Sequence, residues 1–371
     1  MNILNNFEGA YFKYYEFFGK QYVRPFAVSS GVYNSEKISG YTPDMLKSAY
    51  EFDGEFSGEG ITIGIAEAFG SPTIENDINI FSRQFGLPDV NIETETADYG
   101  GINYNDNWII ETSLDCQWVH AFAPRAKIVL AVSSSEEFSD MMNAVARAAE
   151  KSDIVVMSWG SHEFAGQQMY EDMFSRNDAC YIASSGDVGG VTFYPSNSKF
   201  VTSVGGTSLF INGNGEIIGQ QKAWKYSGGG TGRYISIPEY QRINSDVQRM
   251  CGQYRGTPDI AFFADTSPGV AVYHSYPINS KSGWTTGGGT SLGAPCVAGI
   301  AACIAQKNKD VLKNFNTYLY AAAGRTKYVM PQRNFYDVVL GTNGVYSAKP
   351  GYDFCTGLGT PNIKNLIELA K

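Results

Sequence analysis

This sequence of 371 residues has few positive charges and few histidines, and it has no long apolar run and no C-x-x-C pair of cysteines. The net charge of -9 at pH 7 argues against nucleic-acid binding, which needs a basic face. No run approaches the roughly 20 apolar residues of a membrane-spanning helix. No C-x-x-C pair occurs among the six cysteines, so a zinc site is not expected. We therefore expect a globular protein whose partners include neither nucleic acid nor a membrane.

The beginning of the chain also lacks a familiar signal. Residues 1–8 show no basic stretch followed by an apolar run, so no signal peptide is visible. Residues 1–40 are aromatic and polar without clear periodicity, and we interpret them as an N-terminal extension that packs on the rest or stays partly loose. A regular pattern begins at Tyr41, and 41–371 is predicted to form one large domain.

This regular part alternates buried strands with helices. Strands are predicted at 61–66, 127–132, 153–158 and 181–184, and helices near 72–86, 108–122, 136–151 and 166–176. The alternation predicts an α/β fold with a mainly parallel central sheet and helices on both faces. The site of such a sheet lies at the carboxyl ends of its strands. Glu67, Trp159 and Asp187 directly follow predicted strands and should point there.

Three glycines open the most informative stretch, 287–295, which leads into an apolar run at 296–304. The glycines permit a tight turn and the close approach of another chain. Thr290 and Ser291 suit the N-cap of a helix. The Ser291 hydroxyl would then lie near backbone N–H groups and the positive end of the helix dipole. Two interpretations stay open, a helix cap and a nucleophile whose product carries an oxyanion.

A pair of acids, Glu111 and Asp115, occupies one face of a predicted helix. No Lys or Arg lies three or four residues from either acid, and Ile110, Leu114 and Trp118 predict that the helix is largely buried. Two carboxylates held close together cannot easily both ionise, so the pKa of one should rise. The alternatives are a solvated acidic stripe and a pair that performs chemistry.

Asp187 lies between glycines directly after a predicted strand. It is either an ordinary turn residue or a protonated carboxyl group that donates a hydrogen bond to an oxyanion. A histidine base is not favoured, because the sequence has only three histidines and His120 follows Asp115 by five residues, off the face of the acid pair. The proton acceptor for Ser291 is then expected among the carboxylates.

These motifs, in this order, resemble the sedolisin family of serine-carboxyl peptidases, and in particular its kumamolisin branch. The resemblance extends from about Tyr41 to the end of the chain. Its pieces are Glu111-x-x-x-Asp115, Ser158-Trp159-Gly160, Ser185-Gly186-Asp187, Ser227-Gly228-Gly229-Gly230, Arg255-Gly256-Thr257-Pro258-Asp259, Gly288-Gly289-Thr290-Ser291, Phe335-Tyr336-Asp337-Val338 and Pro350-Gly351-Tyr352-Asp353. The family shares the subtilisin fold but uses acids in place of histidine. The resemblance therefore implies a subtilisin-like three-layer fold for the catalytic domain, 41–371.

The resemblance also implies a role for each matched residue. Ser291 would be the nucleophile, Glu111 the general base and then general acid, and Asp115 the residue that orients Glu111. Asp187 would stabilise the oxyanion, where subtilisins have an asparagine. Glu67 and Trp159 would extend the hydrogen-bond network, and the substrate-binding positions would be Ser158, Gly160, Gly228 and Gly289.

One Ca²⁺ ion is the cofactor that the resemblance implies. Two carboxylates and three backbone carbonyls would hold it: Asp337, Asp353, Val338, Lys349 and Gly351. The family usually has a small residue where Lys349 stands, a change that a backbone ligand tolerates. The alternative is an Asp-rich turn without a metal.

The function implied is acyl-enzyme hydrolysis of polypeptides by a monomeric serine endopeptidase in acid. A carboxylate base with a pKa of about 4–5 is ionised in mild acid, where histidine is protonated, so activity is predicted to peak below about pH 5. The alternatives are a tripeptidyl-peptidase, which needs a cleft blocked at one end, and an inactive homologue that binds peptides. Family members usually carry a long prodomain, and about forty residues precede the match here, so activation and an extracellular or acidic location stay open.

Overall fold

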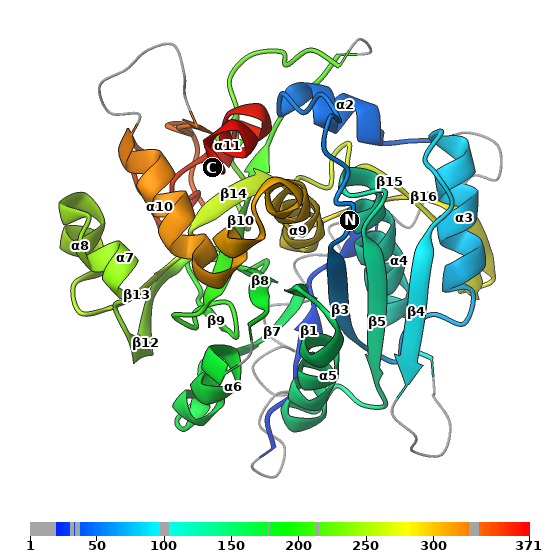
Figure 1. Ribbon diagram of the computed structural model, residues 1–371, viewed down its shortest axis with the longest axis horizontal. Helices are drawn as coiled ribbons and strands as arrows, with labels where there is room; N and C mark the ends of the chain where they lie inside the picture. Colours follow the sequence, from blue (N-terminus) through cyan, green and yellow to red (C-terminus); the bar gives the residue numbers. More distant parts are fainter. Residues whose placement is uncertain are drawn as a thin grey trace.

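An eight-stranded sheet forms the centre of the computed structural model, which describes residues 20–29, 33, 38–96, 104–176, 178–212, 215–325 and 334–371 (Figure 1). The strand order is β11-β10-β8-β6-β3-β5-β4, and β14 pairs with β10. Parallel pairing joins β4 (Asn91–Thr96), β5 (Lys127–Ser133), β3 (Thr62–Ala68), β6 (Ile154–Met157), β8 (Cys180–Ser184), β10 (Val201–Ser208) and β14 (Ile260–Phe263). The short strand β11 (Lys222–Ala223) pairs antiparallel with β10.

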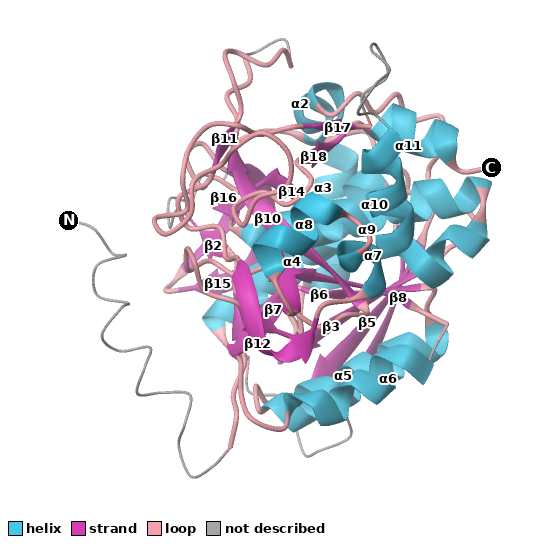
Figure 2. Ribbon diagram, turned by 90° about the vertical axis from the view of Figure 1, so that its left-hand side faces the viewer, coloured by secondary structure: helices cyan, strands magenta, loops and turns pink. Residues whose placement is uncertain are grey.

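Helices cover both faces of this sheet (Figure 2). One face carries α5 (Phe138–Lys151) and α6 (Glu171–Arg176). The other carries α4 (Asp106–Phe122), α9 (Thr290–Lys307), α10 (Phe315–Arg325) and α11 (Ile363–Leu369), with α3 (Ile74–Gln84) packed on α4. The three-layer α/β fold predicted from the sequence is confirmed.

Smaller elements surround these layers. Further strands are β1 (Arg24–Pro25), β2 (Val28–Ser29), β7 (Trp159–His162), β9 (Phe193–Tyr194), β12 (Gly230–Ser236), β13 (Tyr254–Thr257), β15 (Val270–Ile278), β16 (Lys281–Gly288), β17 (Phe335–Tyr336) and β18 (Thr360–Pro361). Further helices are α2 (Pro43–Ala49), α7 (Glu239–Arg242), α8 (Ser245–Cys251) and the 3-10 helices η2 (Gln167–Tyr170) and η3 (Lys309–Asn314).

The alternation of side chains along β3 decides which residues meet the site. Successive strand residues point to opposite faces, so Ile63, Ile65 and Glu67 share one face. Ile63 and Ile65 pack in the core cluster that includes α4 and α9, whereas Ala66 and Ala68 pack in the cluster that includes α5. Glu67 is therefore a carboxyl group on an apolar face, directed toward α4.

Some boundaries differ from the sequence prediction. Glu67 lies inside β3 instead of following it. The edge strand β4 was not predicted, because Ile92 is its only apolar residue. Of the predicted N-terminal extension, only 20–29, 33 and 38–40 are described, and the rest lies outside the described residues. All six cysteines are buried and free. No described helix is both long and apolar enough to cross a membrane.

Candidate active site

Ser291 stands at the junction between β16 and α9. Gly289 has a φ of 96°, a left-handed conformation that suits glycine, and it is the N-cap of α9. Thr290 and Ser291 are thus the first two residues of the helix and not its cap, which corrects the prediction. As a first-turn residue, Ser291 has a backbone N–H without an intrahelical acceptor. Its side chain is fully buried.

Pro295 helps to shape this first turn. It lies inside α9 four residues after Ser291, and a proline has no N–H to donate to the carbonyl of Ser291. The hydroxyl of Ser158 donates to that carbonyl instead, at 3.4 Å. The residue that follows β6 is thereby joined to the start of α9.

The hydroxyl of Ser291 lies within hydrogen-bond distance of a carboxylate. Ser291 Oγ is 3.0 Å from Glu111 Oε2 and 3.0 Å from the carbonyl oxygen of Ser158. The described histidines are engaged elsewhere, with His120 Nε2 at 2.9 Å from the Pro88 carbonyl oxygen and His274 Nδ1 bonded to Tyr276. The geometry thus joins the serine to a carboxylate, in agreement with the sequence argument against a histidine base.

Three buried carboxyl groups form a stack behind Ser291, which we call the acid stack: Glu111, Asp115 and Glu67. All three have no exposed surface, and among the described residues none of them forms an ion pair. Burial, together with the neighbouring charge of Asp115, raises the pKa of both Glu111 and Glu67 well above the ordinary value. Burial also raises the pKa of Asp115, to about 8.

Hydrogen-bond donors from two elements converge on Glu111. Glu111 Oε2 accepts from the backbone N–H of Ala27 at 2.7 Å and from Ser291 Oγ at 3.0 Å. These two donors lower the pKa of Glu111 against the effect of burial, since they stabilise its ionised form. These donors act against burial and the neighbouring charge of Asp115, which together keep the pKa of Glu111 well above its ordinary value.

Asp187 follows β8 and faces the start of α9. Its Oδ1 accepts from the N–H of Thr290 at 2.8 Å and from the Thr290 hydroxyl at 2.7 Å, whereas no described residue donates a hydrogen bond to Oδ2. Burial raises the pKa of Asp187 to about 7. Thr290 also accepts from Gly186 N at 3.1 Å, so this residue fixes the Asp187 turn. The sequence analysis gave Thr290 only a capping role.

Trp159, expected to extend the hydrogen-bond network, bonds to the backbone of β3. Its indole N–H donates to the carbonyl oxygen of Ala66 at 2.7 Å and not to a carboxylate. It therefore anchors β7 to β3 beside the acid stack. Gly228 likewise supports the site from behind, because its N–H donates to Gly186 at 2.7 Å and an added Cβ would lie 2.3 Å from the Ser185 carbonyl oxygen.

Residues 22–29, which we call the cleft segment, lie across this site. Arg24 and Pro25 pair antiparallel with Gly160 and Trp159 in β7, and the N–H of Phe26 donates to the Ser158 carbonyl at 3.2 Å. On the other side, β2 pairs antiparallel with the Gly287 and Gly288 end of β16. The predicted substrate-binding residues Ser158, Gly160 and Gly289 therefore surround a segment of the chain itself. This segment has no periodic pattern of apolar residues.

The implied calcium ligands come together around one loop. Asp337 Oδ2 accepts from the N–H of Gly351 at 2.8 Å, and Asp353 Oδ2 accepts from the N–H of Lys349 at 3.0 Å. Among the described residues no group of three or more His, Cys, Asp or Glu side chains is placed to hold a metal. A site of two carboxylates and backbone carbonyls would contain only two such side chains. The oxygen donors fit Ca²⁺ in type.

Comparison with known proteins gives the family. A family model described as the subtilase family matches residues 100–330, well over half of the chain. The chain belongs to the subtilase family, in its sedolisin branch. It is 28% identical to kumamolisin from Bacillus sp. (strain MN-32) over 87% of this chain, and 30% identical to tripeptidyl-peptidase 1 from Dictyostelium discoideum over 79% of it.

The structural comparison supports the same fold for this chain. The structure of Pseudomonas sedolisin, a serine-carboxyl proteinase complexed with two molecules of pseudo-iodotyrostatin, superposes with a TM-score of 0.75 at 22% identity. The match covers 90% of this chain and 98% of that one. The chain spans 62% of the length of kumamolisin and 52% of that of the tripeptidyl-peptidase.

Proposed function

We propose that the protein is a serine-carboxyl endopeptidase that hydrolyses polypeptides in acid through an acyl-enzyme on Ser291. The observation that carries this proposal is the 3.0 Å contact between Ser291 Oγ and Glu111 Oε2, in a site without a histidine contact to the serine. A nucleophile and a base within hydrogen-bond reach, with a third group behind the base, is the arrangement that activates a hydroxyl.

The proposed reaction moves a proton along this contact. Ser291 Oγ attacks the substrate carbonyl carbon while Glu111 takes the hydroxyl proton, and Glu111 then gives that proton to the leaving amine. Asp115, four residues along α4, would orient Glu111 from behind, and burial raises its own pKa to about 8. Glu67 keeps a second proton at the far end of the acid stack.

Asp187 and the first turn of α9 would stabilise the oxyanion. Thr290 occupies Oδ1 of Asp187, so the proton of a neutral Asp187 resides on Oδ2, which is then a hydrogen-bond donor. The N–H of Ser291 is a second donor at the positive end of the helix. Donors fixed in advance at the developing charge supply a large part of the rate enhancement of acyl transfer.

The protonation of these groups explains a preference for acid. Asp187 donates only while protonated, and its raised pKa of about 7 marks the pH above which that donor is lost. At low pH the limit is protonation of the base, Glu111. A working range in acid, bounded above near neutrality, supports the proposal of an acid peptidase.

An endopeptidase is favoured over a tripeptidyl-peptidase by the length of the acyl side of the cleft. The N–H of Ala27 contacts Glu111, so the residues before Ala27 follow the acyl side of the cleft. Their contacts with the rest of the protein continue for more than three residues. Val23 N donates to the Glu136 carbonyl at 2.9 Å, and Phe138 N donates to the Gln21 carbonyl at 2.8 Å. A cleft that accommodates at least six residues before the bond at Ser291 is suited to internal cuts.

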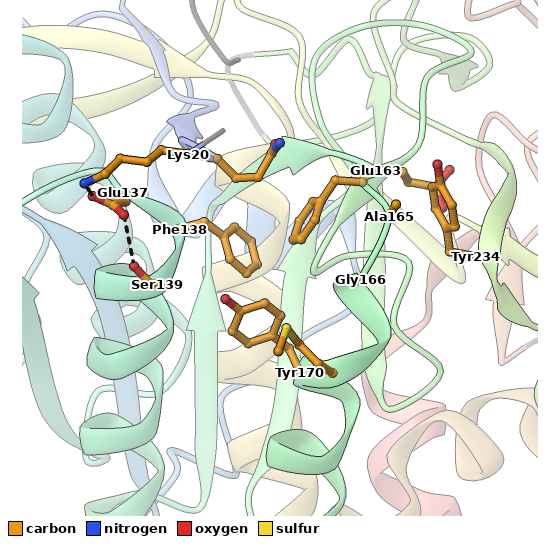
Figure 3. Close-up of a pocket in the computed structure, with 12 residues that line it drawn as sticks. Lys20, Glu137, Phe138, Ser139, Glu163, Ala165, Gly166, Tyr170 and Tyr234 are labelled. Carbon is orange, nitrogen blue, oxygen red and sulfur yellow. Dashed lines mark hydrogen bonds and ion pairs between the residues drawn. The ribbon is translucent and has the colours of Figure 1, made fainter. Parts of the chain in front are cut away.

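A cavity of about 620 Å³ continues this side of the cleft beyond Gln21 (Figure 3). Figure 3 shows the rings of Phe138 and Tyr170 facing it, with Lys20 directed to Glu137 at its rim. Space at this place would let a longer polypeptide pass. A tripeptidyl-peptidase would instead need this end of the cleft to be closed.

Digestion of a denatured protein at pH 3–5 tests the proposed function. Wild type is compared with Ser291→Ala, and with Ser113→Ala as a matched control that removes another buried hydroxyl. We expect internal cuts by wild type and by Ser113→Ala, and at least about a thousandfold slower cutting by Ser291→Ala. Sequential release of tripeptides would favour the exopeptidase, and peptide binding without cutting would favour an inactive homologue.

We also propose one structural Ca²⁺ held by the carboxylates of Asp337 and Asp353 and the carbonyls of Val338, Lys349 and Gly351. The convergence of both carboxylates on the loop at 349–351 supports it. The ion would cross-link the segment around β17 to the loop that precedes β18. Its contribution would be to stability and not to a chemical step.

A further inference from the structure

The acyl side of the cleft extends well beyond the residues next to Ser291. We propose that it carries a distal subsite, in which the carboxylate of Glu137 binds a Lys or Arg side chain seven residues before the bond that is cut. Polypeptides with a basic residue at that position would be preferred substrates. This inference rests on the proposed function, and it adds a class of substrate and the residue that selects it.

The cleft segment shows the register in which a polypeptide meets Ser291. The N–H of Ala27 donates to Glu111 Oε2 at 2.7 Å, and the same oxygen accepts from Ser291 Oγ at 3.0 Å. A substrate that replaces this segment would therefore place its reacting bond directly before the position of Ala27. Lys20 stands at the seventh position before that bond.

Backbone contacts hold this register over its whole length. Val23 N donates to the carbonyl of Glu136 at 2.9 Å, and the carbonyl of Gln21 accepts from Phe138 N at 2.8 Å. An antiparallel β-bridge lies between these two bonds. Such contacts use only peptide groups, which every polypeptide has. Another chain would therefore be aligned along residues 136–138 in the same way.

At the end of this register a basic side chain meets an acid. Lys20 Nζ donates to Glu137 Oε2 at 2.6 Å, and the Ser139 hydroxyl donates to the other oxygen, Oε1, at 3.4 Å. The hydrogen bond to Glu137 and the charge of its carboxylate raise the pKa of Lys20 above the ordinary value, and the charge of Asp140 acts in the same direction. The place that a seventh residue reaches thus favours a positive charge.

The cavity of about 620 Å³ opens beside this ion pair (Figure 3). Among the described residues that line it, Lys20 is the only cation and the acids are Glu137 and Glu163. The rings of Tyr170 and Tyr234 also line it. Carboxylates and aromatic faces both attract a cation, and the same carboxylates repel an acidic side chain. The open volume leaves room for a side chain as large as that of arginine.

The second acid of the cavity, Glu163, is already held by the protein. Thr192 Oγ1 donates to its Oε2 at 2.8 Å, and Asn197 Nδ2 and Arg233 N donate to its Oε1 at 2.5 and 3.0 Å. In contrast, the cation on Oε2 of Glu137 belongs to residue 20, which directly precedes the N-terminal part of the chain in the cleft and would leave with it. Glu137 is then the carboxylate that a substrate meets.

The exposure of the ion pair sets the size of the preference. The side chains of Lys20 and Glu137 are 55% and 25% exposed, and a pair of this kind contributes little. Lysine should therefore be favoured over glutamine by about two- to fivefold in kcat/KM. Salt screens exposed charges, so the preference should shrink as the ionic strength rises.

Digestion of a mixture of denatured proteins at pH 5, with every cut bond mapped by mass spectrometry, tests the inference. Exposed carboxylates are in general ionised at this pH. Wild type is compared with Glu137→Lys, and with Glu150→Lys as a matched control that makes the same change of charge at the other end of α5. We expect Lys and Arg to be enriched at the seventh position before the cuts made by wild type and by the control. Glu137→Lys should show Asp and Glu there instead.

Peptides measure the size of the effect. One well-cut sequence is synthesised with Lys, Gln or Glu at the seventh position, and kcat/KM is measured at pH 5 in low salt and in about 0.5 M NaCl. Wild type should cut the Lys peptide about two- to fivefold faster than the Gln peptide in low salt, and the Glu peptide most slowly. Glu137→Gln should cut the Lys and Gln peptides at about equal rates.

Two results would overturn the inference and leave the proposed function standing. One is that wild type cuts all three peptides at equal rates. The other is that Glu137→Lys keeps the wild-type preference at the seventh position. Absence of any cutting in acid overturns both the inference and the proposed function.

Discussion

Two clusters of buried charge lie in this protein, and they are built in opposite ways. In the acid stack beside Ser291, three carboxyl groups have no cation among the described residues. In the second cluster, Arg255 and Asp259 are equally buried and form an ion pair. Burial alone therefore does not identify a site, because both clusters are fully enclosed.

In the second cluster both charged groups have hydrogen-bond partners. Asp259 accepts from Ser203 N at 2.8 Å, from the Tyr320 hydroxyl at 2.9 Å and from Arg255. Arg255 also donates to the carbonyls of Ser198, Gly256 and Val201. A charge pair with all its hydrogen bonds made can remain ionised inside a protein. We interpret it as structural.

The acid stack leaves carboxyl oxygens without donors. Both oxygens of Glu67 lack a described hydrogen-bond donor, as does Oδ2 of Asp187. Burial without donors disfavours the ionised form of a carboxyl group. Its pKa therefore rises, and the group is tolerated inside the protein because it holds a proton. The comparison teaches that incomplete pairing, and not burial, separates groups that exchange protons from groups that support the fold.

The largest effect expected on activity comes from removing the charge of the proposed base. Glu111→Gln keeps the shape of the side chain but cannot accept the Ser291 proton. We expect peptide hydrolysis at pH 4 to fall by at least about a thousandfold, with a melting temperature equal to or above that of wild type. Activity within tenfold of wild type would mean that another group is the base.

The matching change in the paired cluster should act on stability instead. Asp259→Ala leaves the Arg255 guanidinium buried without its counter-charge, which costs about 3–5 kcal/mol. Urea unfolding measures this loss, and the activity of the molecules that remain folded should be close to that of wild type. A stable Asp259→Ala with lost activity would reverse the assignment of the two clusters.

The pH dependence of stability should follow the unpaired acids. In the fold, Asp115 and Asp187 hold protons up to a pKa of about 8 and about 7, whereas in the unfolded chain they lose them near pH 4. The folded state binds more protons between these values, so the free energy of unfolding should fall as the pH rises from about 4 to about 8. Calorimetry at several pH values measures the slope.

The control for that slope is Asp115→Asn, which cannot ionise. Its melting temperature should change less between pH 4 and pH 8 than that of wild type, because one of the contributing groups is gone. If wild type instead becomes more stable as the pH rises through this range, the buried acids are not protonated in the fold.

The smallest expected effect is that of chelation at the proposed calcium site. A ligand present at 100 times its Kd stabilises the folded state by about 2.7 kcal/mol, so adding EDTA should lower the melting temperature by a few degrees. Asp353→Asn should melt at the same temperature with and without EDTA. A wild type that melts at one temperature in EDTA and in added Ca²⁺ would contradict the site.

The sequence predicted the residues of the site better than it predicted their contacts. Glu111, Asp115 and Ser291 could be singled out because an acid pair without a cation, and a Gly-Thr-Ser turn before an apolar run, are unusual local patterns. The hydrogen-bond partner of Trp159 could not be predicted, because an indole N–H beside the sheet bonds to a backbone carbonyl, such as that of Ala66, as readily as to a carboxylate.

The cleft segment shows where reading the sequence fails for a physical reason. It pairs for two residues with β7 and for two with β16, too briefly for a period of two to appear. Its order comes from partners that are distant in sequence, such as Ser158 and Glu111. Thr290 was similarly underestimated, because its bond to Asp187 joins two turns that are distant in sequence.

The most direct measurement of the central claim is the pH dependence of kcat/KM for wild type and Asp187→Asn. An asparagine amide donates a hydrogen bond at every pH, whereas Asp187 donates only below its pKa of about 7. We predict that wild type is active in acid and loses activity as the pH rises toward 7, and that Asp187→Asn keeps activity to higher pH. A wild-type maximum at or above neutrality, or identical profiles for both proteins, would contradict a site that depends on protonated carboxyl groups.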